Sequence, residues 1–259
     1  MKISICSPSY KRPKVETFEY LSFVKVYVDN REYDDYIKNN PGFENNIISV
    51  PDGVQGNVSR IRNYILDEEF KNGADAVCII DDDMKGIYHF EMKDGYAYYQ
   101  EIVEEKDFYD FLLKGCLLCE EFGFKLWGVN LNKDALNYKH CLPFNTKAVI
   151  LGPFSVHLKN PLRYDERLPL KEDYDIALQH LSKYRGILRL NKYHYNCKQS
   201  KQKGGCATYR NYEREEQQLR LLQKKWGSKI VKIDSSSKAK KKKVNIDYNP
   251  IIHIPIKGV

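Results

Sequence analysis

The stretch AVCIIDDD, residues 76–83, sets an unbroken apolar run directly before three carboxylates. Such a run, bounded by polar residues, predicts a strand buried on both faces, as in a parallel sheet covered by helices. Ligands of open parallel sheets bind beyond the carboxyl ends of the strands, and Asp81, Asp82 and Asp83 follow such an end. Because clustered carboxylates repel one another, they favour a site for a divalent cation. The alternative is an ordinary acidic loop where the strand meets solvent.

Strand-like and helix-like patterns alternate along the first half of the chain. Apolar runs predict strands, and amphipathic segments predict helices, as follows: strands at 3–6, 23–28, 47–50, 76–80 and 125–129, and helices at 31–42, 57–70 and 107–123. This alternation predicts an α/β fold with a mostly parallel central sheet flanked by helices. The apolar segment 148–158 is expected to add a hairpin or an edge strand, and 249–259 to pack back as an edge strand or to meet a partner.

Composition indicates a folded protein. The chain has 259 residues and 42% hydrophobic content, enough for one large domain or two small ones. No apolar run approaches the roughly 20 residues that span a bilayer, and the N-terminus lacks a signal-peptide core. Seven cysteines, an odd number at irregular spacings, suit a reducing compartment, so we expect a cytoplasmic protein. Cys116 and Cys119 lie in an apolar helical run and are expected to pack rather than to bind metal.

Positive charge is concentrated in the C-terminal quarter. Residues 181–243 hold 19 Lys and Arg against 4 Asp and Glu, a local charge of +15, which leaves −8 for the rest of the +7 chain. This asymmetry favours a polyanionic partner for the C-terminal quarter. Lys224, Lys225 and the tract 238–243 are expected to bind phosphates without reading sequence. The alternative for the tract is a solvated tail.

Four sequence elements follow one another in an informative order. They are SPSYKR at 7–12, GNVSRIRN at 56–63, the strand ending in DDD, and Glu172–Asp173 at the start of an amphipathic helix. In this order they resemble a GT-A glycosyltransferase of the family-two type, over about residues 3–184. The segments KEDYDIALQHLSKYRGILRLNKYHYN, GGCATYRN and LLQKKWGSKIV are similar to the TET-associated glycosyltransferases of bacteriophages.

The resemblance implies a Rossmann-like GT-A domain over residues 1–233, with a nucleotide-sugar half at about 1–95 and an acceptor half at about 96–233. A basic C-terminal helical and loop extension ends in a linker and tail at 234–259. It also implies an enzyme that moves a hexose from a nucleotide sugar, expected to be a UDP-sugar, to 5-hydroxymethylcytosine in DNA. The location would then be cytoplasmic, in the host if the protein is phage-encoded.

Matching the family pattern gives roles to individual residues. Asp81 and Asp83 are expected to hold Mn²⁺ or Mg²⁺ against the diphosphate, since alternate strand residues share a face, and His194 is a candidate third ligand with a purely structural role as its alternative. Arg60 has a rival interpretation as a surface helix residue. The nucleotide sugar is expected to contact Pro8, Ser9, Tyr10, Arg12, Arg60, Arg62, Asn63, Asp81, Asp82, Lys203, Gly204, Gly205 and Arg210.

The acceptor hydroxyl must lose a proton as it attacks the anomeric carbon, and a carboxylate is the expected base. Asp173 matches the catalytic aspartate of inverting relatives, and Glu172 is the second candidate. Both residues also suit a structural role, because acidic side chains favour helix N-termini. Retention of anomeric configuration would weaken the assignment.

Three alternatives stay open. A GT-A enzyme could act on a glycan, lipid or protein, although the basic C-terminal region disfavours this. A phosphotransferase of the haloacid dehalogenase type also has a strand ending in D-x-D, but it needs Thr or Val where this chain has Lys85. A nucleic-acid-binding protein without catalysis would show no metal-dependent nucleotide affinity. The sugar, the modified base and the oligomeric state are not decided by the sequence.

Overall fold

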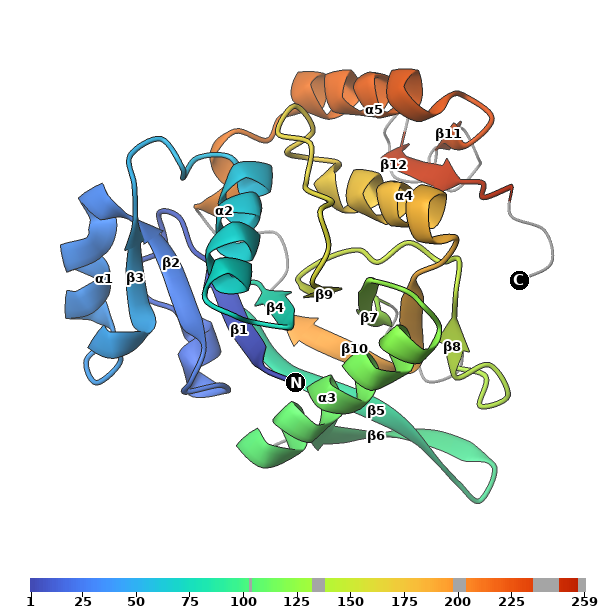
Figure 1. Cartoon of the computed structure of the whole chain (residues 1–259), viewed down its shortest axis with the longest axis horizontal. Helices are drawn as coiled ribbons and strands as arrows, with labels where there is room; N and C mark the ends of the chain where they lie inside the picture. The colour runs from blue at the N-terminus through green and yellow to red at the C-terminus, as the bar shows by residue number, and fades with distance from the viewer. Residues whose placement is uncertain (103, 132–137, 198–203, 235–246, 256–259) are drawn as a thin grey trace.

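The computed structural model of the chain describes residues 1–102, 104–131, 138–197, 204–234 and 247–255 (Figure 1). The helices are α1 (Tyr33–Asn39), α2 (Val58–Lys71), α3 (Glu105–Glu121), α4 (Glu172–Tyr184) and α5 (Tyr212–Trp226). The strands are β1 (Ile3–Pro8), β2 (Lys25–Asp29), β3 (Ile47–Val50), β4 (Ala76–Ile80), β5 (Met84–Lys93), β6 (Tyr96–Ile102), β7 (Leu126–Asn130), β8 (Phe144–Asn145), β9 (Phe154–Leu158), β10 (Leu188–Cys197), β11 (Val231–Asp234) and β12 (Asp247–Ile252).

One large sheet runs through the molecule in the order β3-β2-β1-β4-β9-β7-β10-β5-β6, with β8 paired to β10. Strands β1 to β4 are parallel to one another, and β10 is parallel to β7. Within the described residues, β5, β8 and β9 run against the common direction of the other strands of this sheet. The predicted α/β class with a mostly parallel central sheet is therefore confirmed.

The sheet is covered by helices on both faces, and strand β4 shows why its sequence is apolar throughout. Cys78 and Ile80 belong to a core that also contains residues of α1 and α3, whereas Val77 and Ile79 belong to a second core with residues of α2, α4 and α5. Successive strand residues point to opposite faces, so a strand between two cores has no polar position until it ends. The three aspartates begin at that end.

The structure corrects one expectation about strands and adds detail to another. Segment 148–158 forms neither a hairpin nor an edge, because β9 lies inside the sheet, antiparallel to both β4 and β7. The C-terminal segment does pack back, but β12 pairs with β11 in a separate two-stranded sheet rather than with the main one. Cys116 and Cys119 are buried in α3, as expected for packing residues.

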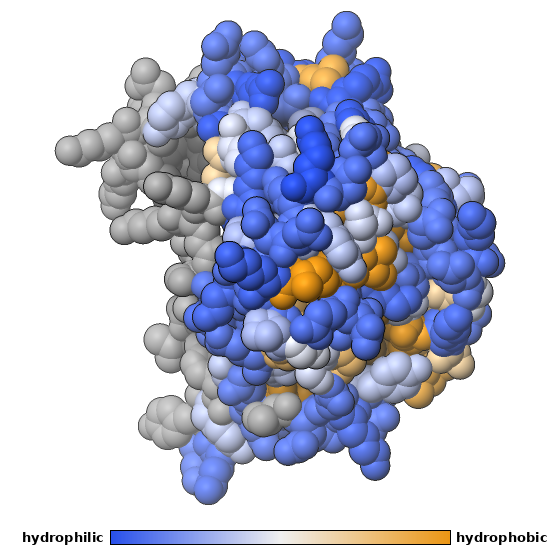
Figure 2. Space-filling model, turned by 90° about the vertical axis from the view of Figure 1, so that its left-hand side faces the viewer, coloured by the Kyte–Doolittle hydropathy of each residue, from blue (hydrophilic) through white to orange (hydrophobic). Residues whose placement is uncertain are grey.

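The surface on the side of α1 and β3 is mostly hydrophilic, with hydrophobic residues in small separate patches (Figure 2). Across the described residues, no helix combines the length and apolar character needed to cross a membrane.

Candidate functional site

The candidate site lies where β1 and β4 end side by side. These strands are parallel neighbours, with Cys6 opposite Ile79, so the loop after Pro8 and the aspartates after Ile80 meet at one edge of the sheet. A cavity of ≈ 500 Å³ opens there, and its wall also includes the first turns of α2 and α4, the end of β10 and the segment 205–210. The edge predicted from the strand-to-carboxylate junction is therefore the place where distant segments converge.

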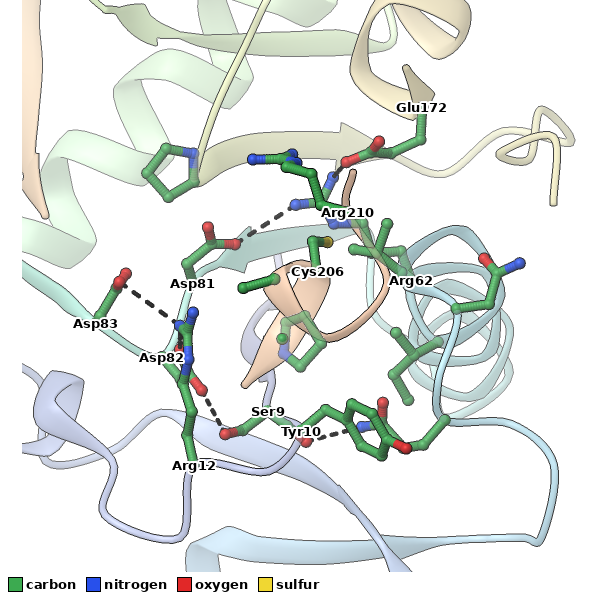
Figure 3. Close-up of a pocket in the computed structure, with 18 of the residues that line it drawn as sticks. Ser9, Tyr10, Arg12, Arg62, Asp81, Asp82, Asp83, Glu172, Cys206 and Arg210 are labelled. Carbon is green, nitrogen blue, oxygen red and sulfur yellow. Dashed lines mark hydrogen bonds and ion pairs between the residues drawn. The ribbon is translucent and has the colours of Figure 1, made fainter. Parts of the chain in front are cut away.

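The middle aspartate, Asp82, holds the loop that follows β1. Its carboxylate accepts a hydrogen bond from Ser9 Oγ and pairs with Arg12 Nη1 at 2.8 Å. The Ser9 hydroxyl also contacts the Tyr36 hydroxyl at 2.8 Å, which ties the loop to α1. Asp82 thus points toward the loop, and Arg12 Nη1 also lies 3.6 Å from Asp83 Oδ2, whereas Asp81 points toward Arg62 (Figure 3).

Arg62, from the first half of α2, joins the two acidic parts of the site. Its guanidinium lies 3.4 Å from Asp81 Oδ1 and 3.2 Å from Glu172 Oε1 (Figure 3). Its Cζ also lies 5.6 Å from the centre of the Tyr164 ring. The side chain is 7% exposed. A buried guanidinium between two carboxylates links the end of β4 to the start of α4 through charge as well as packing.

Glu172 and Asp173 open α4 inside the protein rather than at its surface. Asp173 Oδ1 accepts the N–H of Tyr174 at 2.8 Å, and Oδ2 accepts the N–H of Gly152 at 3.3 Å. Gly152 has φ +86° and no room for a side chain, because a Cβ there would lie 2.2 Å from the Tyr195 hydroxyl. The close approach of Gly152 therefore lets a backbone N–H orient the Asp173 carboxylate.

The crowding of acids raises several carboxyl pKa values. Burial, together with the charges of Asp81 and Asp82, raises the pKa of Asp83 to about 7. Burial and the neighbouring Asp173 raise the pKa of Glu172 to about 8, while Arg62 opposes the rise. Burial also raises the pKa of Asp173, again opposed by Arg62. Such values match groups that exchange protons or accept a cation near neutral pH.

The segment after residue 203 packs onto the loop that follows β1. Gly205 N–H donates to the Tyr10 carbonyl at 2.8 Å. Gly204 has φ +99°, and a Cβ there would lie 2.6 Å from both Arg12 Cγ and the Lys11 carbonyl oxygen. Two glycines allow the chain to pass close to that loop, and Arg210 then reaches the cavity from the same segment.

Asp81 and Asp83 suit a divalent metal that takes most of its ligands from phosphate and water. Within the described part of the chain, no three His, Cys, Asp or Glu side chains gather into a complete metal cage. Asp81 and Asp83 nevertheless offer hard carboxylate oxygens at the cavity wall, and the Asp81 side chain is 39% exposed. Mg²⁺ commonly binds through one or two carboxylates plus phosphate oxygens and water, so this pair fits such an ion.

Most of the residues predicted from the sequence line this one cavity. Asn63 instead uses both ends of its amide on the backbone of Tyr164, and Arg60 pairs with Glu166 at 2.9 Å on the surface of α2. Lys203 lies outside the described residues. The predicted residues that line the cavity are Pro8, Ser9, Tyr10, Arg12, Arg62, Asp81, Asp82, Asp83, Glu172, Asp173, Gly205 and Arg210.

His194, the candidate third metal ligand whose alternative was a structural role, packs against aromatic rings. Its ring stacks on Phe90 at 4.9 Å and on Tyr88 at 5.5 Å, and the cavity lining does not include it. Its strand neighbour Tyr195 lines the cavity, and successive strand residues face opposite sides. Strand alternation was the signal that could have excluded His194 once its neighbour was known to face the site.

Several lining residues were missed by the sequence interpretation. Gln55 is 8% exposed, and its Nε2 group donates to the carbonyls of Ser9 and Tyr27 at 2.9 and 3.0 Å. Tyr195, Cys197, Cys206 and Tyr209 also line the cavity, and no role was predicted for these residues from the sequence.

Comparisons with known proteins place this geometry in context. The family model described as TET-Associated Glycosyltransferase matches residues 16–205. Among solved structures, the chain is similar to glucosyl-3-phosphoglycerate synthase from Mycobacterium tuberculosis in complex with Mn²⁺, UDP-glucose and phosphoglyceric acid, with 13% identity, a TM-score of 0.51, and coverage of 90% of this chain and 83% of that one. A mycobacterial protein gives 11% identity, a TM-score of 0.50, and coverage of 91% and 80%.

A third similar structure is Staphylococcus aureus TarS 1-349 in complex with UDP, with 13% identity and a TM-score of 0.43. The match covers 75% of this chain and 59% of the TarS chain. No match was found among curated proteins. The structural similarities with TM-scores of 0.50 and 0.51 support the fold.

Proposed function

Because the chain belongs to the TET-associated glycosyltransferase family, we propose that it transfers a sugar from a nucleotide sugar to the hydroxymethyl group of 5-hydroxymethylcytosine in DNA, with a divalent metal. The observation that carries the proposal is the pairing of two acidic groups around one cavity. Asp81 and Asp83 lie at the end of β4, and Glu172 and Asp173 lie at the start of α4. The first pair suits a metal-bound diphosphate, and the second suits proton removal from an acceptor.

The donor is expected to bind along the loop after β1. Asp81 and Asp83 would hold Mn²⁺ or Mg²⁺, which neutralises the diphosphate so that it can leave. Arg12, which pairs with Asp82, and Arg210, which pairs with Glu215, line the same cavity and bring guanidinium groups to it from two different segments. The glucosyl-3-phosphoglycerate synthase structure, which shares the fold, contains Mn²⁺ and UDP-glucose, and this favours a UDP-sugar as the donor.

The acceptor hydroxyl is expected to approach Asp173. As the hydroxyl oxygen forms a bond to the anomeric carbon, Asp173 takes its proton, and the bond from that carbon to the phosphate oxygen breaks with its electrons leaving on the diphosphate. Gly152 orients Asp173 by its N–H, and Arg62 partly offsets the charge of Glu172 beside it. Direct displacement of this kind inverts the anomeric configuration.

DNA is supported as the acceptor by the family and by charge. Residues 181–243 carry a local charge of +15, and such an excess binds phosphates. Lys225 does not belong to this phosphate-binding set, because it pairs with Asp165 and Asp175. A 5-hydroxymethyl group points into the major groove, so the base needs either flipping or an approach from that groove. The second candidate is a glycan, lipid or protein hydroxyl.

The proposal can be tested with the full chain, Mn²⁺, a panel of sugar nucleotides, and DNA that contains either 5-hydroxymethylcytosine or cytosine. Nucleoside masses are measured after digestion, with wild type, Asp83→Asn and Asp34→Asn. Asp34 is an exposed acid of α1 outside the cavity, so its variant controls for loss of one negative charge.

A gain of one hexose confined to hydroxymethylated DNA, lost in Asp83→Asn and kept in Asp34→Asn, is the expected result. Metal-dependent hydrolysis of a sugar nucleotide without any transfer to DNA would keep the glycosyltransferase site and overturn the DNA acceptor. Transfer that is unaffected by chelation or by Asp83→Asn would overturn the metal role.

A further inference from the structure

Helix α5 follows residues 16–205, which the family model matches. It lies beside α4 (Figure 1). Only Leu219 and Leu222 of α5 are buried. Its polar contacts with residues 171 and 175, at the start of α4, are made by Glu215, Lys225 and Trp226. Burial of charges is costly unless they are paired, so these contacts need an explanation beyond apolar packing.

The first contact lies directly before the candidate base. Lys171, the residue that precedes α4, is 2% exposed, and its Nζ lies 2.5 Å from Glu215 Oε2 of α5. The other oxygen of Glu215 lies 3.1 Å from Arg210 Nε, and Arg210 lines the cavity. The Glu215 carboxylate therefore pairs with two cations, Lys171 before α4 and Arg210 at the cavity.

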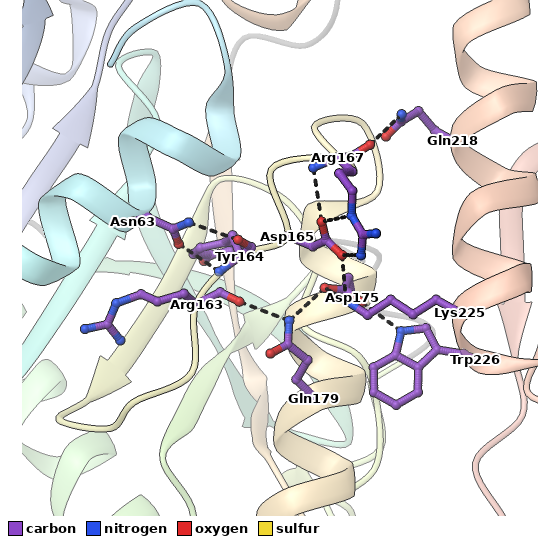
Figure 4. Close-up of polar contacts among 10 residues, drawn as sticks. All are labelled: Asn63, Arg163, Tyr164, Asp165, Arg167, Asp175, Gln179, Gln218, Lys225 and Trp226. Atoms are coloured by element: carbon purple, nitrogen blue, oxygen red, sulfur yellow. Dashed lines mark hydrogen bonds and ion pairs between the residues drawn. The ribbon is translucent and has the colours of Figure 1, made fainter. Parts of the chain in front are cut away.

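The second contact lies two residues after the candidate base, Asp173. Asp175 is fully buried, and Lys225 Nζ lies 2.8 Å from its Oδ1, the oxygen that also accepts Trp226 Nε1–H at 2.8 Å (Figure 4). Gln179 Nε2 donates to the other oxygen at 2.7 Å. Lys225 also reaches Asp165, which Arg167 holds with two nitrogens.

The two contacts bracket the candidate carboxylates. Lys171 and Asp175 are one helical turn apart, and Glu172 and Asp173 lie between them. The start of α4 has no side-chain cap, because Lys171 at the capping position makes no such hydrogen bond. Ion pairs with α5 therefore stabilise the start of α4, where a Ser or Asp cap usually does so.

We propose that α5 is a two-point brace, in which Glu215 and the Lys225–Trp226 pair are positioning residues that fix Glu172 and Asp173 in the cavity. The catalytic part of this inference rests on the function proposed above. A displacement of about 1 Å at a reacting group can cost about 100-fold in rate. Loss of one contact is therefore expected to lower kcat at least about tenfold.

The test uses Lys225→Met and Glu215→Gln, with Lys106→Met as the control and Lys225→Arg as the conservative rescue. Lys106 is an exposed lysine of α3 outside the cavity. Hydrogen–deuterium exchange of the peptide over 172–184 reports the position of α4 whether or not the protein is active. Sugar transfer is measured beside it as kcat and KM across pH 5–9.

We expect faster exchange over 172–184 in Lys225→Met and Glu215→Gln, with near wild-type exchange over α1. In Lys225→Met kcat should fall with little change in the KM of the sugar nucleotide, whereas in Glu215→Gln that KM should also rise because Arg210 is released. Lys225→Arg should restore both the slow exchange over 172–184 and the wild-type kcat.

Exchange over 172–184 in Lys225→Met that equals exchange in Lys106→Met would overturn the brace. Faster exchange with unchanged kcat and pH profile in an active enzyme would overturn the positioning role. If the wild type transfers sugar to no acceptor, the proposed function fails, and the exchange result still decides whether α5 fixes the start of α4.

Discussion

Replacement of Arg62 by Met should move the acidic limb of the pH–rate profile to higher pH. Arg62 lies 3.2 Å from Glu172 and 3.4 Å from Asp81, and its charge opposes the rise in the pKa values of Glu172 and Asp173. The base must be unprotonated to accept a proton. Loss of the cation leaves burial and mutual repulsion unopposed, so a smaller fraction of the enzyme is competent at any pH below the limb.

The size of the displacement follows from the distance. A full opposite charge within about 4–6 Å changes a carboxyl pKa by about 1–3, so we expect the limb of kcat/KM to move up by at least about one pH unit. Each unit corresponds to about a tenfold loss of rate at a fixed pH below the limb. The rate should therefore recover in part as the pH rises, which a folding defect alone would not produce.

The matched control is Arg60→Met, two positions earlier on the same helix. Arg60 pairs with Glu166 at 2.9 Å, the two side chains are 41% and 47% exposed, and neither lines the cavity. An exposed pair of this kind contributes about 0–1 kcal/mol. An unmoved limb in Arg62→Met, or an equal movement in Arg60→Met, would refute the assignment of the limb to the Glu172–Asp173 pair.

Three further results are expected. Burial raises the pKa of Glu172 from 4.5 to about 8, so its contribution to the free energy of unfolding declines as pH rises through this window, and thermal melts of Glu172→Gln should depend less on pH there. Gly204→Ala should weaken nucleotide binding in calorimetry more than Gly73→Ala, because both have positive φ but only the first would place its Cβ against the loop after β1. Asp82→Ala should lower stability by about 1–3 kcal/mol in denaturant unfolding through loss of its loop contacts, whereas Asp83→Ala should mainly lower Mn²⁺-dependent nucleotide affinity.

The position of the site could be predicted because it depends on a local pattern. A strand with apolar residues at every position must lie between two cores, and the end of a parallel strand must meet the ends of its neighbours. Residues 76–83 therefore predict both the buried strand β4 and the acidic edge, and the loop after β1 joins that edge because β1 pairs with β4. No long-range information was needed beyond the direction of the strands.

The remaining features depend on pairings between distant segments. The insertion of β9 between β4 and β7 cannot be read from residues 154–158, because an apolar run suits an inner strand and an edge strand alike. Lys225 was predicted to bind phosphates because it stands among basic residues, yet its partners are Asp165 and Asp175, 60 and 50 positions away. Local charge density does not reveal which cations are already neutralised by acids elsewhere in the chain.

The charges of the cavity bear on how its two expected ligands bind. Among the described residues, the acidic side chains that line it outnumber the arginines. Arg12 is paired with Asp82 and Asp83, Arg62 with Asp81 and Glu172, and Arg210 with Glu215. A diphosphate that entered alone would add negative charge to a wall that is already acidic, with little free cation to receive it. A divalent ion bound to Asp81 and Asp83 offsets this negative charge and gives the diphosphate a cation to bind. Metal and nucleotide should therefore bind with positive coupling, each raising the affinity for the other by the same factor.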